Sequence, residues 1–259
     1  MRVAIGYRIS IDVQGTAPLV SILRPQTGAN QRVLSEALFI EPMAPIREFT
    51  DSFGNLCQRF VLVEGSTVIS YNATVDTSDT IDVAPGAPFT LVQDLPADVL
   101  QYLLPSRYCQ ADFFLDLATS ITLNALPGYD QAEAIRYWVN QNLRYEYGVS
   151  NASTSALDTE RYRAGVCRDF SHLGITLCRA LRIPARMVFG YLQGLDPMDF
   201  HAWFEAFVNG RWYTFDATQQ YPKGNRVVVA YGRDAADTAQ ISEYGFLTVT
   251  DQSVWANPG

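Results

Sequence analysis

Apolar and polar residues alternate along the first part of the chain. The clearest run opens the chain, where every second residue is apolar: Val3, Ile5, Tyr7, Ile9, Ile11 and Val13. A period of two is typical of a β-strand with one buried face. Further apolar runs at 34–40, 56–63 and 67–75 are separated by turn residues, and Glu64-Gly65-Ser66 is expected to close a hairpin between the last two. Residues 1–88 are therefore predicted to form a small antiparallel β-sandwich domain.

The pattern changes at Ala84-Pro85-Gly86-Ala87-Pro88. Two prolines and a glycine cannot continue a strand, so the first domain is predicted to end here, and residues 89–259 form the predicted second domain. After a block of helical spacing, apolar runs typical of strands return at 186–193, 201–208, 211–216, 225–231 and 246–250. A helix block followed by strands predicts an α+β domain, with helices packed on an antiparallel sheet.

The helical block has three parts. Helical spacing is mixed at 98–104 and 111–126, which Pro105-Ser106 separates. It is clearer from residue 130 onward, where Asp130-Gln131-Ala132-Glu133 matches an N-terminal capping signature. The following stretch 151–159 is rich in Ser, Thr and Asn and is expected to be a loop.

The next helix carries a cysteine in its first turn. Apolar residues recur at helical spacing in the order Phe170, Leu173, Gly174, Leu177, Cys178 and Leu181. Pro184 ends the run and Gly165 interrupts the chain before it, so Cys167 is predicted to lie at the helix N-terminus. Free N–H groups and the helix dipole favour an anion there, and the thiolate is the nucleophilic form of cysteine. A small buried hydrophobic residue is the alternative interpretation of Cys167 alone.

A hairpin is predicted to bring a histidine to an aspartate. Asn209-Gly210 between two apolar runs is a strong signal for a two-residue turn, because both residues tolerate a positive φ. This turn pairs Val208 with Arg211 and places His201 and Asp216 on one face as diagonal neighbours. Their side chains are then close enough to form a hydrogen bond. A three-residue loop would instead put them on opposite faces.

Each of these residues also has an ordinary structural interpretation. His201 could be a half-buried imidazole, and Asp216 could cap a turn. Taken with Cys167, however, they supply a nucleophile, a base and an orienting carboxylate, the combination used in covalent acyl transfer. His172 is the other histidine; it lies about 140° round an ideal helix from Cys167 and is expected to hold the helix by a hydrogen bond.

Composition narrows the class of protein. The 259 residues are 48% hydrophobic and 18% charged, which is typical of a soluble globular protein with a large core. A net charge of −8, with no cluster of Lys or Arg, argues against nucleic acid or an anionic membrane as the main partner. No apolar run reaches the ~18 residues of a membrane span. The N-terminus lacks the apolar core of a signal peptide, so we expect a cytoplasmic protein.

The number and spacing of the cysteines and histidines indicate whether the chain forms disulfides or binds a metal. The four cysteines are Cys57, Cys109, Cys167 and Cys178, and disulfides between them are not expected in a reducing compartment. The chain has no Cys-x-x-Cys pair, only two histidines, and no Asp-rich loop of the calcium-binding EF-hand kind. We therefore expect neither a metal site nor a cofactor.

Taken together, these segments resemble the bacterial transglutaminase-like superfamily. The resemblance rests on a set of motifs in the second domain: the cysteine motif Arg163-Ala164-Gly165-Val166-Cys167-Arg168-Asp169-Phe170, the segment 178–186, the histidine motif His201-Ala202-Trp203-Phe204-Glu205, the aspartate motif Trp212-Tyr213-Thr214-Phe215-Asp216-Ala217-Thr218, and the tail 231–237. The segment 102–108 is similar to the one that links this core to the N-terminal β domain of the family. The match is densest from 163 to 237 and is specific as a set.

The resemblance implies a papain-like α+β core behind an N-terminal β-sandwich. Carried over by position, Cys167 is the nucleophile, His201 the general base and acid, and Asp216 the residue that orients the imidazole. The family usually has proline after the aspartate, whereas Ala217 stands here. Because proline would fix φ at this position, its absence predicts a less firmly held Asp216.

The expected activity is thiol-dependent acyl transfer on amide bonds of a peptide or protein substrate. Hydrolysis of a peptide or isopeptide-type amide, as in a cysteine protease, is favoured. Two alternatives stay open: transfer of a protein glutamine acyl group to an amine, and a peptide-binding module without turnover. The backbone N–H of Cys167 is expected to bind the oxyanion together with a second donor, for which Tyr145 and Trp138 are candidates. The sequence predicts no oligomeric state.

Overall fold

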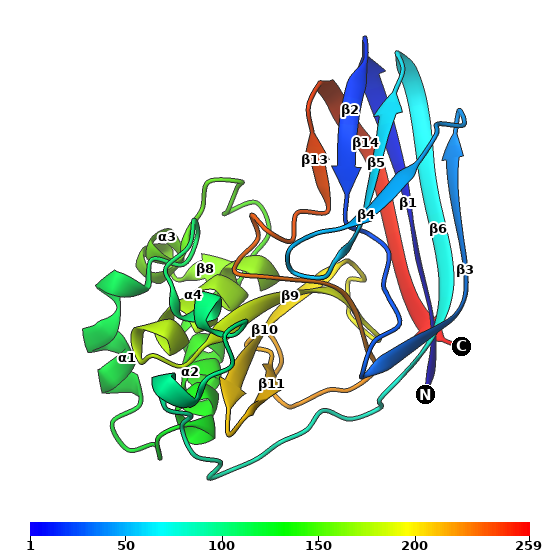
Figure 1. Ribbon diagram of the computed structural model, residues 1–259. Coiled ribbons are helices and arrows are strands. Elements are labelled where there is room, and N and C mark those ends of the chain that lie inside the picture. Colours follow the sequence, from blue (N-terminus) through cyan, green and yellow to red (C-terminus); the bar gives the residue numbers. More distant parts are fainter.

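The structure, a computed structural model, describes residues 1–259. Figure 1 shows an all-β half, in which the two chain termini lie side by side, and a second half in which helices cover a sheet. The all-β half contains two four-stranded antiparallel sheets, ordered β14-β1-β6-β3 and β13-β2-β5-β4, which form a sandwich. Its strands are β1 (Arg2–Gln14), β2 (Ala17–Ser21), β3 (Gln31–Glu41), β4 (Arg47–Thr50), β5 (Leu56–Leu62), β6 (Gly65–Thr77), β13 (Ile241–Glu243) and β14 (Phe246–Pro258).

Strand β1 lies between β14 and β6 and shows why the first part of the chain folds as a sandwich. Its alternating apolar residues, from Val3 to Val13, are at most 4% exposed and belong to the sandwich core. The charged residues between them, Arg8 and Asp12, are exposed. Burying one such Val, Ile or Leu side chain contributes about 1.5–3 kcal/mol, so the alternation fixes which face of the strand turns inward.

The predicted hairpin between residues 56–63 and 67–75 is wrong. The two strands β5 and β6 do follow each other along the chain, but they belong to different sheets. Both edges of β5 are already paired, one with β2 and the other with β4. The turn at Gly65, where φ is 115°, therefore carries the chain from one layer of the sandwich to the other.

The end of the chain also differs from prediction. Residues 241–259, predicted as part of the second domain, instead complete the sandwich: β14 pairs with β1, and β13 pairs with β2. The apolar run recognised in the sequence ends at Thr250, because Asp251, Gln252 and Ser253 interrupt it, yet the strand continues to Pro258. Strand pairing with β1 overrides the polar pattern there. The boundary at residue 88 stays a prediction.

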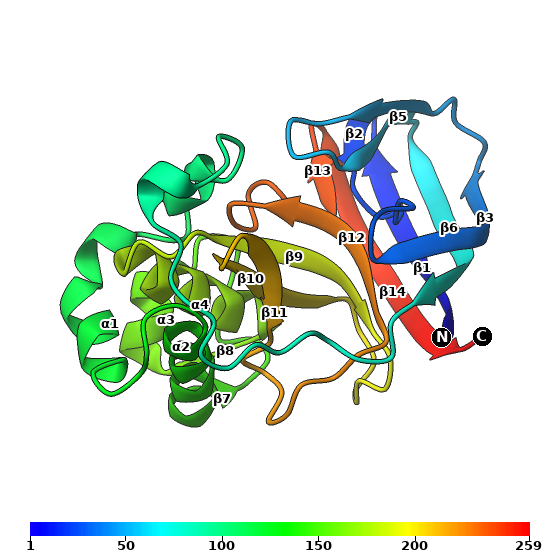
Figure 2. The same cartoon turned by 60° about the horizontal axis from the view of Figure 1, so that its bottom comes forward.

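Helices cover one face of the sheet of the second half (Figures 1 and 2). This sheet has the strand order β11-β10-β9-β12 and is called the central sheet below. Its strands are β9 (Ala185–Leu192), β10 (His201–Val208), β11 (Arg211–Phe215) and β12 (Arg226–Gly232). The helices are α1 (Leu115–Ile121), α2 (Tyr129–Asn142), α3 (Ala156–Tyr162) and α4 (Cys167–Ala180). Short 3₁₀ turns lie at Val92–Asp94, Leu100–Leu103 and Ala111–Phe113, and a parallel two-stranded pair is formed by β7 (Arg144–Tyr145) and β8 (Ala164–Gly165).

Helix α2 begins one residue before its predicted capping signature. Its first residue is Tyr129, and the Gln131 side chain accepts a hydrogen bond from the N–H of Gly128. Asp130, predicted as the capping residue, instead accepts a hydrogen bond from the N–H of Gly86 at 2.8 Å. The carboxylate thus ties the predicted domain boundary to the first turn of the helix.

The other helical segments also differ from prediction in extent. The stretch 151–159, expected to be a loop, includes the start of α3, because Asp158 accepts hydrogen bonds from both the N–H and the hydroxyl of Ser155. The stretches 98–104 and 111–126 form only 3₁₀ turns and the seven-residue α1. Their apolar spacing was mixed, and the helices it supports are correspondingly short.

Helix α4 packs closely against β10 at Gly174. A Cβ atom at this position would lie 2.5 Å from the ring of Phe204, so glycine is needed for this approach. Phe204 is fully buried and stacks on Phe215 of β11, with 5.5 Å between ring centroids. This contact sets the spacing between the helix that begins with Cys167 and the strand that begins with His201.

The sandwich and the central sheet share one hydrophobic core. The ring of Phe200, just before β10, lies 5.9 Å from the ring of Tyr7 in β1 and 5.3 Å from the rings of Phe189 and Tyr191 in β9. The same cluster continues into β12 through Val227, Val229 and Ala230. The central sheet is therefore covered by helices on one face and by the sandwich on the other (Figure 2).

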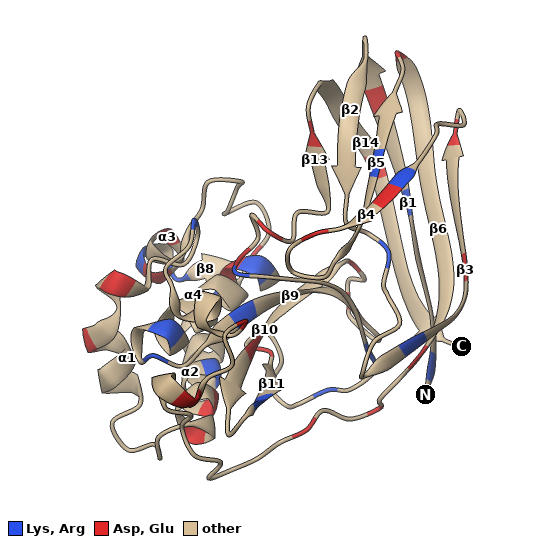
Figure 3. Cartoon of the chain, viewed as in Figure 1, with Lys and Arg blue, Asp and Glu red and all other residues tan.

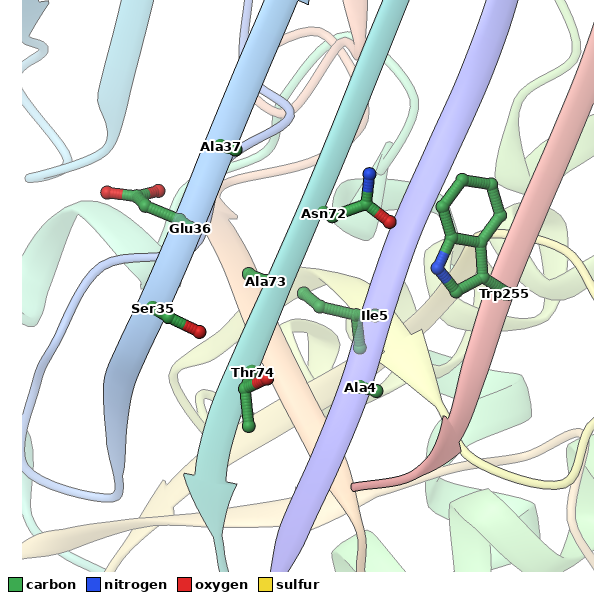
Figure 4. A pocket seen from close by; sticks show the side chains of 9 residues that line it. All are labelled: Ala4, Ile5, Ser35, Glu36, Ala37, Asn72, Ala73, Thr74 and Trp255. Atoms are coloured by element: carbon green, nitrogen blue, oxygen red, sulfur yellow. The ribbon is translucent and has the colours of Figure 1, made fainter.

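An open hollow of about 340 Å³ lies on the outer face of the sheet β14-β1-β6-β3 (Figure 4). Trp255 of β14 and Asn72 of β6 stand on either side of β1 there. Gly6 lies beneath Trp255, since a Cβ atom at residue 6 would come within 2.3 Å of the indole. A large ring over a strand glycine covers the gap left by the missing side chain, which gives Trp255 a packing role.

Charged residues of both signs are mixed over the helices and strands (Figure 3). Two charge pairs with little exposure lie in or beside the central sheet, Arg186 with Glu205 and Arg226 with Asp216. No helix combines the length and the apolar character needed to cross a bilayer.

Candidate active site

The N-terminus of α4 is shaped by Gly165 and Asp169. The Asp169 carboxylate is completely buried and accepts a hydrogen bond from the N–H of Val166 at 2.9 Å. It fills the space beside Gly165, where an added Cβ atom would lie 2.6 Å from the Asp169 side chain. Arg168 lies 3.0 Å from the same carboxylate and balances its charge. The short sequence from Gly165 to Asp169 thus fixes the turn that presents Cys167.

Cys167 differs from the other cysteines in its exposure. It is the first residue of α4, as the sequence predicted. It is also partly exposed, whereas Cys57, Cys109 and Cys178 are at most 2% exposed; all four are free thiols. Burial raises the pKa of Cys57 to about 11 and that of Cys109 to about 12, and it also raises the pKa of Cys178. These three are therefore neutral thiols at neutral pH, and Cys167 is the cysteine that solvent reaches.

Strands β10 and β11 form the hairpin predicted from the Asn209-Gly210 turn. Both turn residues have a positive φ, 49° and 79°. Val208 pairs with Arg211, the register that a two-residue loop requires. His201, at the start of β10, and Asp216, directly after β11, are brought together at the same edge of the sheet.

His201 is buried between Asp216 and Cys167. Its Nε2–H donates a 2.7 Å hydrogen bond to Oδ2 of Asp216, and Cys167 lies close to the ring. Because Nε2 is bound to Asp216, Nδ1 is the nitrogen left for Cys167. Burial lowers the pKa of His201, but the charge and hydrogen bond of Asp216, supported by Cys167, outweigh burial and raise the pKa to about 9. His201 is therefore an imidazolium at neutral pH.

Asp216 is held by four hydrogen bonds. Its Oδ2 accepts from His201 at 2.7 Å and from Nη2 of Arg226 at 2.8 Å, and its Oδ1 accepts from the N–H and the hydroxyl of Thr218 at 3.0 and 2.7 Å. Burial raises the pKa of Asp216, but His201 and Arg226 hold that pKa well below its usual range. The looser hold expected from Ala217 is not found, because these bonds fix the carboxylate directly.

The pKa shifts of His201 and Asp216 make the stability of the fold depend on pH in opposite directions. The folded state binds the proton of His201 more tightly than the unfolded chain does, so this contribution is complete below about pH 6.5 and is lost as the pH rises through about 9. The folded state disfavours a proton on Asp216, so that contribution is present above about pH 4 and is lost as the pH falls. Both are present at neutral pH.

Arg226 belongs to the site although nothing in the sequence motifs pointed to it. It is the first residue of β12, is 6% exposed, and its guanidinium lies 4.8 Å from the ring of Trp203. The one available signal was its position in the predicted strand 225–231, where a charged residue precedes the apolar run from Val227 to Ala230. A buried arginine requires a counter-charge, which Asp216 supplies.

Tyr145 reaches the nucleophile from a separate element. The parallel pair of β7 and β8 sets Tyr145 opposite Gly165, two residues before Cys167, and the N–H of Glu146 donates to the carbonyl of Gly165 at 2.9 Å. Burial, followed by the charge of Cys167 and the contact with Tyr147, raises the pKa of Tyr145 well above its usual value. The backbone N–H of Cys167, which lies near the Tyr145 hydroxyl, lowers that pKa in part. The hydroxyl therefore keeps its proton beside that N–H.

His172 and Trp138 have packing roles. His172 stacks on Tyr108, and its Nε2 accepts a hydrogen bond from the N–H of Ala235 at 3.1 Å, which is the holding role predicted for it. Burial lowers the pKa of His172 to about 3, so the ring is neutral. The guanidinium of Arg163 covers the Trp138 ring at 4.8 Å. No group of three or more His, Cys, Asp or Glu side chains is arranged to hold a metal ion, and the expected absence of metal and cofactor stays a prediction.

Comparison with known sequences and structures identifies the family. Residues 115–217 match the profile of the transglutaminase-like superfamily, and residues 7–77 match that of the bacterial transglutaminase-like N-terminal region. The crystal structure of a candidate cysteine protease from Cytophaga hutchinsonii is 39% identical in sequence, with a TM-score of 0.93 over 100% of this chain and 90% of that one. The chain belongs to the transglutaminase-like superfamily.

The transglutaminase-like relatives extend to mycobacteria. An uncharacterized protein of Mycobacterium leprae is 25% identical over 85% of this chain and 83% of its own length. One of Mycobacterium tuberculosis is 27% identical over 89% of this chain and 82% of its own length. The two family profiles and the Cytophaga hutchinsonii structure confirm the predicted fold class, a papain-like α+β core with an N-terminal β region.

Replacing Asp216 by asparagine tests the buried charge pair. Asp216→Asn is expected to lower the free energy of unfolding at pH 7 by about 3–5 kcal/mol, because it leaves the buried Arg226 without a counter-charge. Urea denaturation measures the loss. Asp82→Asn is the matched control: Asp82 pairs with Arg211 at the surface, where removing a pair costs at most about 1 kcal/mol. A loss at Asp216 no larger than at Asp82 would contradict the assignment.

Proposed function

We propose that this transglutaminase-like protein is an enzyme that carries out thiol-dependent acyl transfer on amide bonds, with hydrolysis of a peptide or isopeptide-type amide as the reaction. The observation that carries the proposal is the placement of His201 between a partly exposed cysteine at a helix N-terminus and a buried, ionised carboxylate. Cys167, His201 and Asp216 are then the nucleophile, the general acid and base, and the orienting group.

Transfer of the Cys167 proton to His201 generates the nucleophile. A proton on His201 is stabilised by Asp216 on one side, so the proton of the Cys167 thiol can reside on Nδ1 and leave a thiolate. The sulfur attacks the carbonyl carbon of the scissile amide, and a C–S bond forms as the carbonyl oxygen becomes an oxyanion. The first turn of α4 adds free N–H groups and the positive end of the helix dipole near the sulfur.

Tyr145 and the backbone N–H of Cys167 are the proposed hydrogen-bond donors to the oxyanion. The Tyr145 hydroxyl keeps its proton and lies near that N–H, and in this proposal the two groups donate to a substrate oxygen that enters between them. An oxygen placed there accepts two hydrogen bonds, and one such donor contributes on the order of 3 kcal/mol to the transition state. Of the two candidates named from the sequence, Tyr145 is therefore preferred over Trp138, which packs under Arg163.

The reaction is completed by two proton transfers. As the C–N bond breaks, His201 gives its Nδ1 proton to the departing amine, and an acyl-enzyme remains on Cys167. His201 then takes a proton from water, whose oxygen attacks the thioester carbon. The C–S bond breaks, a carboxylic acid leaves, and the released thiolate beside the protonated His201 restores the starting pair. An amine in place of water would give the transferase reaction.

The similarity to the Cytophaga hutchinsonii protein supports hydrolysis, because that protein is described as a candidate cysteine protease. The superfamily name keeps transfer to an amine as the second enzymatic possibility. We also propose a peptide or protein as the substrate and the cytoplasm as the location, the latter from the sequence alone.

Alkylation near pH 6 tests whether Cys167 is activated. Iodoacetamide is expected to modify Cys167 at least about tenfold faster than any other cysteine, because the other three are buried thiols with raised pKa values. Peptide mapping by mass spectrometry locates the label. Cys167→Ala is the control and should retain the circular dichroism spectrum and melting temperature of the wild type. Absence of selective modification would contradict the nucleophile assignment and favour a binding module.

The products formed from a peptide library in H₂¹⁸O distinguish hydrolysis from transfer to an amine. Hydrolysis places ¹⁸O in a new carboxyl group and gives an acyl-enzyme on Cys167 visible in the intact mass, and both signals should be absent in Cys167→Ala. A fluorescent primary amine added to the same reaction, with casein as acceptor protein, reports transfer. Incorporation of the amine without ¹⁸O would overturn hydrolysis in favour of the transferase.

A further inference from the structure

Arg226 shares one carboxylate oxygen with His201. Its Nη2–H donates to Oδ2 of Asp216 at 2.8 Å, the oxygen that also accepts the 2.7 Å hydrogen bond from His201. The Nε–H of Arg226 donates to the carbonyl of Lys223 at 2.9 Å, and the Trp203 ring packs against the guanidinium. All three members of this cluster, His201, Asp216 and Arg226, have side chains at most 6% exposed.

We propose that Arg226 is a positioning residue of the active site, and that the N-terminal β-sandwich acts on the reaction by holding the strand from which Arg226 projects. The proposal rests on the proposed thiol chemistry and extends it by a role for the sandwich. Arg226 does not touch the reacting atoms. It fixes the rotation of the Asp216 carboxylate and, through that group, the ring of His201.

The sandwich holds β12 by side chains that mimic a neighbouring strand. β12 is an edge strand of the central sheet. The side-chain amide of Gln31 donates to the carbonyl of Val228 and accepts from its N–H, both at 2.7 Å. Asn55 does the same for Tyr231, donating at 2.7 Å and accepting at 2.8 Å. Two amide side chains of the sandwich thus satisfy backbone groups that an edge strand would otherwise present to solvent.

The start of β12 is held at Arg226 itself. The hydroxyl of Thr77, the last residue of β6, donates to the Arg226 carbonyl at 2.7 Å, and the N–H of Asn225 donates to the carbonyl of Ser78 at 2.8 Å. Gly224 lies against the backbone of Asp79, since an added Cβ atom there would come within 2.0 Å of it. The end of the sandwich strand therefore clamps the three residues that end in Arg226.

The effect of Arg226 on the Cys167 thiol passes through Asp216 and His201. The groups that face the Asp216 carboxylate are His201 from β10, Arg226 from β12 and the neutral Thr218, and His201 also faces Cys167 from α4. Removing Arg226 frees the carboxylate to rotate, which weakens its support of the imidazolium. A carboxylate that turns away from Nε2 no longer offsets the burial of the imidazolium, so the thiolate forms only at higher pH.

The pH dependence of Cys167 alkylation by iodoacetamide tests the proposal without a known substrate. Arg226→Gln is expected to move the midpoint of the alkylation rate to higher pH by at least about one unit, which is about a tenfold slower rate at pH 6. Arg226→Lys can still donate to Asp216 but not to the Lys223 carbonyl at the same time, so it should recover only part of the shift. A residue with only a structural role would change the melting temperature and leave the midpoint where it is.

The role of the sandwich is tested by Gln31→Ala, which removes two hydrogen bonds to β12, and by Thr77→Val, which removes one; neither changes a residue of the central sheet. Both are expected to shift the midpoint in the same direction as Arg226→Gln and by less. Gln14→Ala, an exposed residue of β1, is the matched control and should keep the wild-type midpoint. These variants also keep the test valid if Arg226→Gln does not fold.

The outcomes separate this inference from the proposed function. If wild-type Cys167 is not alkylated selectively, the thiol chemistry fails and the inference fails with it. If wild-type Cys167 is selectively alkylated but folded Arg226→Gln has the wild-type midpoint, Arg226 is not a positioning residue. Wild-type midpoints in both Gln31→Ala and Thr77→Val would overturn the part assigned to the sandwich.

Discussion

The buried carboxylate of Asp216 is the group on which the rest of the site depends. An ionised carboxylate taken out of water costs several kcal/mol unless cations and donors surround it, and here His201, Arg226 and Thr218 do so. In return its charge keeps His201 protonated at neutral pH, which gives the thiolate of Cys167 a partner. One desolvated anion thus decides the charge state of the whole cluster. Without it, burial alone would leave the imidazole neutral and the thiol unactivated.

The fold supplies this anion and its partners from two separate layers. On the helical side, Gly174 lets α4 approach Phe204, so the helix that begins with Cys167 lies close to the strand that begins with His201. On the opposite side, the sandwich shares its core with β9 and β12 and pairs with β12 through amide side chains. A buried ion pair is weak evidence for stability by itself, but it is a demanding geometric constraint. The sandwich is placed to meet that constraint, because it fixes the strand that carries Arg226.

What could be predicted from the sequence was set by short-range rules. The strand β1, the start of α4 at Cys167 and the register around Asn209-Gly210 each follow from spacing or turn chemistry within about fifteen residues, and all are found in the structure. The failures depend on partners far away along the chain. Strand β14 was misplaced because its partner, β1, is at the other end of the chain. The role of Arg226 was missed because it depends on an ion pair with Asp216, and no local pattern links these two residues. A charged residue at the start of an apolar strand is usually exposed to solvent, so the local sequence does not single out Arg226.

The charge state of His201 tests the account most directly. The chain has only two histidines, so ¹⁵N NMR of protein labelled at histidine reports both rings without mutation. One ring, His172, should stay neutral from pH 5 upward, because burial lowers its pKa to about 3. The other should be an imidazolium through neutral pH and lose its proton near pH 9. A His201 ring that titrates near pH 6.5, as an unpaired histidine does, would contradict the central role of Asp216.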